Sequence, residues 1–187
     1  MALSGRRACL YRQVLGDAFD TLPKQLQAIH DSTKARSWEG VAHVLRGKGL
    51  LSKVLGGVFG FPPSADQTPV KVQFDPQNGG EKWTRTFGNK TFSSVQTRGA
   101  GRNEHLLVER FGAIEVALAL VVEDNKLFLI PRRWSLFGLP LPKVLLPSGN
   151  SFEAQEKGQF QFDVEISAPV IGLIAAYQGI LKPCSQK

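Results

Sequence analysis

Hydrophobic positions recur at two different spacings along the chain, and the change between them divides it into two parts. Between residues 10 and 22 apolar side chains lie three and four positions apart, which predicts an amphipathic helix. A second predicted helix has Pro23 in its first turn and buries Leu26 and Ile29. The helical spacing returns at Val41, Ala42, Val44 and Leu45 after Trp38. The sequence therefore predicts a helical part over residues 8–61.

After Gln67 the apolar spacing becomes two, which predicts β-strands over residues 68–183. The predicted strands are separated by dipeptides typical of tight turns, at Gly88-Asn89, Asp124-Asn125 and Lys157-Gly158. Strands joined in this way pair antiparallel, and a large sheet of this kind twists and curls. The expected fold class is α+β in one domain, 1–187. Its N-terminal helices would pack on a large, strongly curved antiparallel β-sheet, a half-barrel or barrel-like meander of about eight to nine strands.

The segment "GKGLLSKVLGGVFGFPP" (47–63) is apolar, rich in glycine and dotted with lysine. A helical wheel over Leu50 to Phe59 gives a wide apolar arc and a narrow charged edge, formed by Arg46 and Lys53. This pattern favours a short, mostly buried helix whose charged edge faces water. Three roles stay open for residues 47–61: a lid over a pocket, a plug in the core, or a membrane contact.

Composition and charge restrict the function classes only coarsely. The chain has 187 residues and a formal net charge of +7, which favours anionic partners without selecting one. Trp83, Phe87 and Phe92 are aromatic residues that could stack on bases, but basic residues are not interleaved with them, so we expect no nucleic acid partner. We expect a cytoplasmic protein, because no secretory signal and no apolar run long enough to span a membrane is found. Peripheral membrane contact is possible but not favoured.

Candidate chemistry is concentrated on the predicted strands. Trp83, Arg85 and Phe87 share one face of a strand, where the arginine could bind an acidic group or pair with Glu109 or Glu115. The strand 113–122 carries bulky residues on one face and small ones, with Glu115, on the other. On the concave side of a curled sheet, the small face would leave room for a cavity or for packed helices. Tyr177 could place its hydroxyl in the same space. The candidate ligand-binding residues are Trp83, Arg85, Phe87, Glu109, Glu115, Tyr177 and His30.

Metal and cofactor sites are not expected. The histidines show no metal-binding spacing with each other or with Cys9 and Cys184, and no GxGxxG motif follows a strand.

A spaced set of short motifs resembles one bacterial family. The motifs are "WTRTF" (83–87), "VERFG" (108–112), "GLPLP" (138–142), "LLP" (145–147), "FQFDV" (160–164) and "YQGIL" (177–181). Together with the upstream residues Leu22-Pro23, Ile29-His30 and "GFP" (60–62), they resemble domain of unknown function 4166. That family is also found attached to oxidoreductase domains of the saccharopine-dehydrogenase-like kind. The resemblance implies that Glu109 and His30 occupy family positions, and it suggests a possible oxidoreductase partner.

Three functional hypotheses follow from these observations. The first is a domain that binds a hydrophobic or amphipathic small molecule, possibly anionic and lipid-like, between the helices and the curved sheet. The second is an isomerase- or cyclase-type enzyme that uses Glu109 or Glu115 with Arg85 and Tyr177 in the same pocket. The third is an accessory domain that docks on an oxidoreductase.

Overall fold

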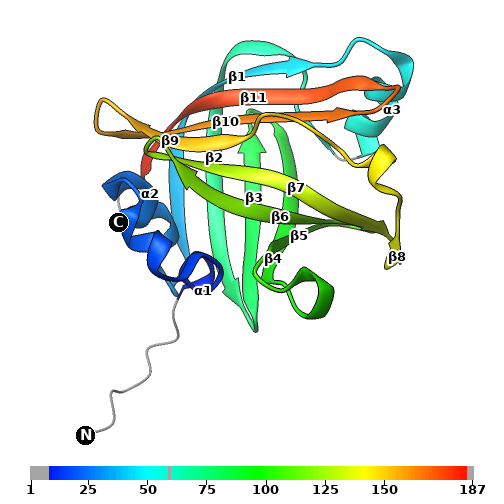
Figure 1. The fold of residues 1–187 in the computed structure, drawn as a ribbon. Helices are drawn as coiled ribbons and strands as arrows, with labels where there is room; N and C mark the ends of the chain where they lie inside the picture. Colours follow the sequence, from blue (N-terminus) through cyan, green and yellow to red (C-terminus); the bar gives the residue numbers. More distant parts are fainter. Residues whose placement is uncertain (1–8, 59, 185–187) are drawn as a thin grey trace, which may run out of the picture.

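The protein folds as a closed antiparallel β-barrel with short helices at its two ends (Figure 1). The computed structural model describes residues 9–58 and 60–184. Within these residues ten strands pair in a ring, in the order β1, β2, β3, β4, β5, β6, β7, β9, β10, β11 and back to β1. The predicted antiparallel, barrel-like sheet is confirmed, but eight to nine strands were too few.

The ring strands are β1 (Arg36–Arg46), β2 (Ala65–Gln77), β3 (Gly80–Phe87), β4 (Lys90–Arg98), β5 (Leu107–Phe111), β6 (Ile114–Glu123), β7 (Lys126–Leu136), β9 (Phe152–Glu156), β10 (Gln159–Ala168) and β11 (Gly172–Pro183). A short strand, β8 (Leu139–Pro140), pairs only with β7. The helical elements are α1 (Leu10–Leu15), η1 (Gly16–Thr21), α2 (Lys24–His30), α3 (Leu50–Val58), η2 (Gly101–Asn103) and η3 (Lys143–Leu145). None of the helices in the described residues is long and apolar enough to cross a membrane.

The helix predicted from Trp38 to Leu45 is wrong, because this segment is strand β1. Apolar residues occupy both faces of β1: Trp38, Ala42 and Val44 point inward, while Val41 and Leu45 are exposed on the outer wall. When both faces of a strand carry apolar residues, the combined apolar positions lie three and four residues apart, as they do along one face of a helix. Pairing with β11 closes the barrel, and a Cβ at Gly40 would lie only 1.8 Å from the backbone oxygen of Ile180. Formation of β1 thus depends on Gly40 and on pairing with β11, which lies at the other end of the sheet-forming sequence.

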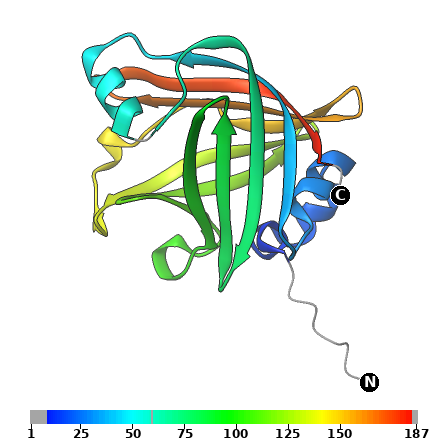
Figure 2. The same cartoon turned by 180° about the vertical axis from the view of Figure 1, so that it is seen from behind.

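The hairpins follow the turn chemistry of the sequence. Asp124 and Asn125 both have positive φ between β6 and β7, and Lys157 and Gly158 both have positive φ between β9 and β10. Such turns match the right-handed twist of the paired strands. Consecutive strands from β2 to β7 are neighbours in the sheet, and Figure 2 shows this meander from behind.

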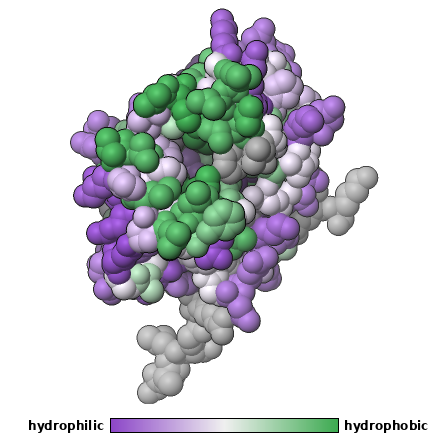
Figure 3. Space-filling model, turned by 90° about the vertical axis from the view of Figure 1, so that its right-hand side faces the viewer, coloured by the Kyte–Doolittle hydropathy of each residue, from purple (hydrophilic) through white to green (hydrophobic). Residues whose placement is uncertain are grey.

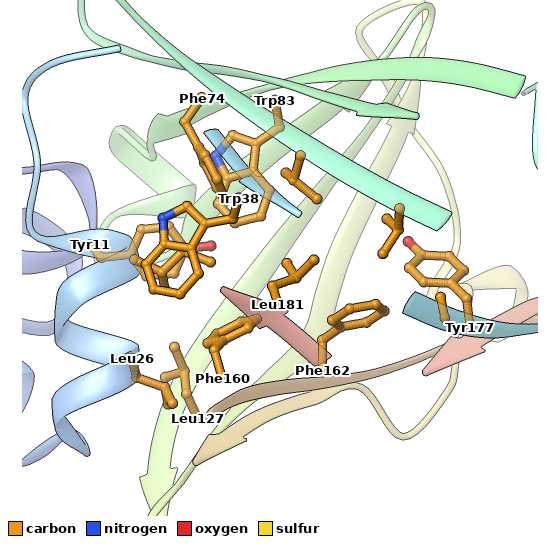
Figure 4. Close-up of a cluster of buried hydrophobic side chains, with 14 of the residues drawn as sticks. Tyr11, Leu26, Trp38, Phe74, Trp83, Leu127, Phe160, Phe162, Tyr177 and Leu181 are labelled. Carbon is orange, nitrogen blue, oxygen red and sulfur yellow. The ribbon is translucent and has the colours of Figure 1, made fainter. Parts of the chain in front are cut away.

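The core lies inside the barrel and is rich in aromatic side chains. Figure 4 shows Phe160, Phe162 and Leu181 pointing into the interior, between Trp38 on one side and Tyr177 on the other. Helices α1 and α2 cover one end of this interior, where Tyr11, Leu26 and Ile29 are fully buried. The opposite end lies beside α3 and η3 (Figure 1). The helical part therefore closes one end of the barrel rather than covering one face of an open sheet.

Candidate functional site

The barrel encloses a cavity of about 430 Å³ that runs between the two ends. Near the helical end it is lined by the fully buried Tyr11 and Ile29. Toward the opposite end it is lined by the partly exposed Leu55 of α3, Leu145 of η3 and Ile171. Since exposure of the lining increases toward α3 and η3, the cavity reaches solvent there, and we call this end the mouth.

Hydrocarbon and aromatic side chains form most of the cavity wall. Strands β2, β3, β6 and β10 each contribute apolar residues at alternate positions, because successive side chains of a strand point to opposite faces. These strand residues are Val70, Val72, Phe74, Trp83, Phe87, Ile114, Val116, Leu118, Phe160, Phe162 and Val164. The site is therefore an apolar chamber with a few polar groups set into its wall.

Arg85 and Glu109 form the central polar group. The Arg85 Nη2 donates to Glu109 Oε1 at 3.0 Å, and the Arg85 Nη1 donates to Ser94 Oγ at 2.8 Å. Ser94, on the strand between them, in turn donates to the same Glu109 oxygen at 2.6 Å. Burial lowers the pKa of the Arg85 guanidinium, but the charge of Glu109 outweighs it and raises that pKa above the ordinary value. Arg85 thus stays charged inside the barrel.

Tyr177 brings a hydroxyl group to the same chamber from β11. Its ring packs edge-on against Phe87, with centroids 5.3 Å apart. In the described part of the chain, no side chain or backbone group hydrogen-bonds its hydroxyl, and none bonds Glu109 Oε2. These two oxygen atoms are available to a bound molecule.

Burial raises the pKa of Tyr177 to about 12. The charge of Arg85 opposes this rise, and the charge of Glu109 adds to it. Tyr11 is buried too, and its pKa is raised well above the ordinary value by burial and then by the charge of Glu153. These are the two tyrosines of the chain. Because the pKa of each is raised, both hydroxyls are neutral hydrogen-bond donors at ordinary pH.

We predict that tyrosine absorbance near 295 nm stays constant in the folded protein until pH approaches about 12. In denaturant both rings should ionise near pH 10. Because the folded state holds these protons more tightly, the free energy of unfolding should fall as pH rises from about 10 to 12. A one-tyrosine signal near pH 10 in the native protein would contradict the burial of one of the rings.

A second polar group joins the helical end to the barrel. His30 Nε2 lies 2.6 Å from Glu153 Oε2, and the imidazole stacks on Tyr11 with centroids 3.6 Å apart. The Tyr11 hydroxyl donates to Gln96 Oε1 at 3.2 Å. His30 is fully buried and does not line the cavity, whereas its partner Glu153 does.

The structure brings most of the predicted site residues together. Trp83, Arg85, Phe87, Glu109 and Tyr177 line one cavity, and the predicted pair of Arg85 with a glutamate is formed by Glu109. Whether they bind a ligand stays a prediction.

Two of the candidate residues, Glu115 and His30, do not line the cavity. Glu115 pairs with Arg110 at 3.0 Å, and His30 is buried behind its partner Glu153. The expectation that the small-residue face of 113–122 borders a cavity was wrong, because the bulky face, including Val116 and Leu118, points inward.

Several lining residues were missed by sequence reasoning. Gln96 and Glu153 are inward-facing polar residues of β4 and β9, and Tyr11 comes from α1. The buried positions of β4 alternate as Phe92, Ser94, Gln96. Polar residues on an otherwise apolar face were the signal that could have identified Ser94 and Gln96. Glu153 gave no comparable signal, because its neighbours Phe152 and Ala154 are apolar.

The fold and the cavity together define a ten-stranded antiparallel barrel, within the described residues, with an apolar interior chamber. A family model described as "Domain of unknown function (DUF4166)" matches residues 22–181, and the chain belongs to that family. No curated protein and no solved structure matches the chain. Docking on an oxidoreductase partner stays a prediction from the family resemblance.

Proposed function

We propose that this protein binds an apolar or amphipathic small molecule inside the barrel. The observation that carries the proposal is the chamber of about 430 Å³ with hydrocarbon walls. Two oxygen atoms in it, Glu109 Oε2 and the Tyr177 hydroxyl, have no hydrogen-bond partner within residues 9–58 and 60–184. Protein interiors are normally packed without voids larger than a water molecule, whereas small-molecule pockets measure about 300–1,000 Å³. The size and the apolar wall together support a ligand site rather than a packing defect.

The charges in the wall indicate what the ligand's buried end should be. Arg85 is the only Lys or Arg among the cavity-lining residues identified in the described chain, and three carboxylates line the same cavity: Glu109, Glu153 and Glu165. Arg85 is already paired with Glu109. An anionic head group placed inside would meet more negative than positive charge, so we propose a neutral buried end, such as a hydroxyl or carbonyl.

Such an end fits the free groups of the chamber. A hydroxyl could donate to Glu109 Oε2 and accept from the Tyr177 hydroxyl, while the hydrocarbon body lies along the aromatic walls. An acidic head group, where the ligand has one, would stay at the mouth. The excess of positive charge in the sequence therefore supports an acidic head group only outside the chamber.

An enzyme that moves a proton on the bound molecule, as an isomerase or cyclase does, is a second candidate. It draws on Glu109 Oε2, a carboxylate oxygen with no hydrogen-bond partner among the described residues, in the cavity that Tyr177 also lines. A Glu109→Gln variant that still binds ligand but no longer converts it would favour this reading. Retained conversion in that variant would remove Glu109 as a proton carrier.

Titration with the neutral fluorescent probe N-phenyl-1-naphthylamine tests the binding proposal. Val116 lines the cavity, so Val116→Trp should narrow it and weaken the saturable fluorescence increase that we expect with the wild type. Val121 lies on the opposite face of β6, outside the cavity lining, so Val121→Trp adds the same ring and should leave binding unchanged. Equal binding by both variants would overturn the proposal.

A further inference from the structure

Large apolar side chains are exposed on both sides of the cavity mouth. On one side lie Leu50, Leu51 and Val54 of α3, which we call the α3 lip. On the other lie residues from the end of β7 through η3, which we call the β8 lip: Leu136, Phe137, Leu139, Val144 and Leu145. Figure 3 faces this end of the molecule and shows apolar side chains gathered in separate groups across it. Val170, fully exposed in the turn between β10 and β11, adds a further apolar side chain.

The orientation of α3 is the reverse of that expected for a surface helix. Its small and polar positions, Ser52 and Gly56, are buried, whereas Leu50 is 78% exposed. The sequence predicted a mostly buried helix, and this prediction is wrong for the apolar arc, because Leu51 and Val54 are exposed. A helix normally turns its apolar stripe toward the core, so this arrangement leaves an apolar surface without a partner.

Arg46 fixes this orientation from beneath. Its guanidinium donates to the backbone oxygens of Phe61 at 2.6 Å and of Lys53 at 3.3 Å. A Cβ on Gly56 would lie 2.1 Å from Arg46 Nη2, so this glycine permits the close approach. The expectation that Arg46 faces water was wrong: it is partly buried and holds α3 with Leu50 and Leu51 outward.

The β8 lip shows the same kind of exposure at a turn. Phe137 and Gly138 both have positive φ at the tip between β7 and β8, a conformation that favours Asn-Gly or Asp-Gly. Here the first position is a phenylalanine that is 80% exposed. Nothing in the packing of the described residues requires an aromatic ring at this tip.

The charged residues around the two lips indicate which kind of surface the lips contact. Residues 40–65 and 132–152 contain no aspartate or glutamate. They carry five exposed cations: Lys48, Lys53, Arg132, Arg133 and Lys143. Exposed apolar side chains flanked by lysine and arginine, without carboxylates, are the chemistry of segments that lie in the interface of an anionic bilayer.

We propose that the α3 lip and the β8 lip dock this protein on an anionic lipid bilayer, with the cavity mouth turned toward the membrane. Continuity with the cavity supports this orientation, since Leu55 of α3 and Leu145 of η3 also line it. The docking itself requires no ligand in the barrel. Its purpose, passage of an apolar molecule between bilayer and chamber, rests on the proposed function.

Vesicle flotation with the full chain tests the docking. We expect binding to vesicles with about 30% phosphatidylserine in phosphatidylcholine at low salt, and a bound fraction reduced about tenfold on pure phosphatidylcholine or at about 0.5 M salt. Leu51→Ser/Val54→Ser and Phe137→Ser/Leu139→Ser should each reduce binding by about tenfold or more. The matched control is Val41→Ser/Ile180→Ser, an exposed cross-strand pair on the outer wall, which should bind like wild type.

Three outcomes would overturn the docking: no flotation of the wild type, equal loss in the Val41/Ile180 control, or self-association that the lip variants abolish. Self-association of that kind would mean that the lips contact a second copy of the chain and not a membrane. The probe titration without vesicles separates this proposal from the binding function. Lip variants that lose flotation but keep probe binding would support both the membrane docking and the ligand-binding function. A wild type that floats but does not bind the probe would contradict only the ligand-binding function.

Discussion

Replacing Arg85 with methionine should lower the free energy of unfolding by about 3–5 kcal/mol, because it leaves the buried Glu109 carboxylate without its cation. Both side chains are about nine-tenths buried. Urea denaturation followed by tryptophan fluorescence measures the change. This is one of the two largest stability effects that the structure predicts, because the pair lies in the apolar interior, where a lone charge is costly.

Two comparisons separate this effect from loss of packing. The double variant Arg85→Met/Glu109→Leu removes both charges and should recover most of the lost stability. Arg110→Met breaks the ion pair with Glu115 on the outer wall, where Arg110 is 63% exposed, and should change stability by less than about 1 kcal/mol. If Arg85→Met were no more harmful than Arg110→Met, the interior ion pair described here would be wrong.

Replacing His30 with alanine should also lower the free energy of unfolding by about 3–5 kcal/mol. The change removes the stack on Tyr11 and leaves Glu153 buried without its partner. Because His30 ends α2, the helical end of the barrel should loosen first. Hydrogen exchange should therefore accelerate in α1 and α2 more than in the central strands.

His43 supplies the matched control for His30. It lies 3.4 Å from Asp66 in an exposed pair, so His43→Ala should change stability by less than about 1 kcal/mol. Adding Glu153→Gln to His30→Ala removes the unpaired charge and should restore part of the loss. Uniform acceleration of exchange through all strands in His30→Ala would argue against a local role for the His30–Glu153 contact.

The sequence was informative where structure depends on neighbours along the chain. Alternation in β3 placed Trp83, Arg85 and Phe87 on one face, and turn dipeptides located the hairpins. The pairing of Arg85 with a glutamate followed from the rarity of lone charges in a core. These inferences needed only local periodicity and the cost of burying charge.

The sequence was not informative where structure depends on closure. The pairing of β1 with β11 joins the first and the last strand of the described chain, and the apolar residues on both faces of β1 imitated a helix. The direction that a strand face points also depends on closure, which is why Glu115 was misplaced. The orientation of α3 could not be predicted, because it is set by Arg46 beneath Gly56 rather than by its own amphipathic pattern.

The central claim is that the barrel interior is a binding chamber, and the paired tryptophan variants on β6 test it most directly. In the N-phenyl-1-naphthylamine titration the wild type and Val121→Trp should each bind one probe per chain with similar affinity. Val116→Trp should remain folded, by thermal melting, and bind the probe much more weakly. A wild type without saturable binding, or a folded Val116→Trp that binds as well as Val121→Trp, would contradict the claim.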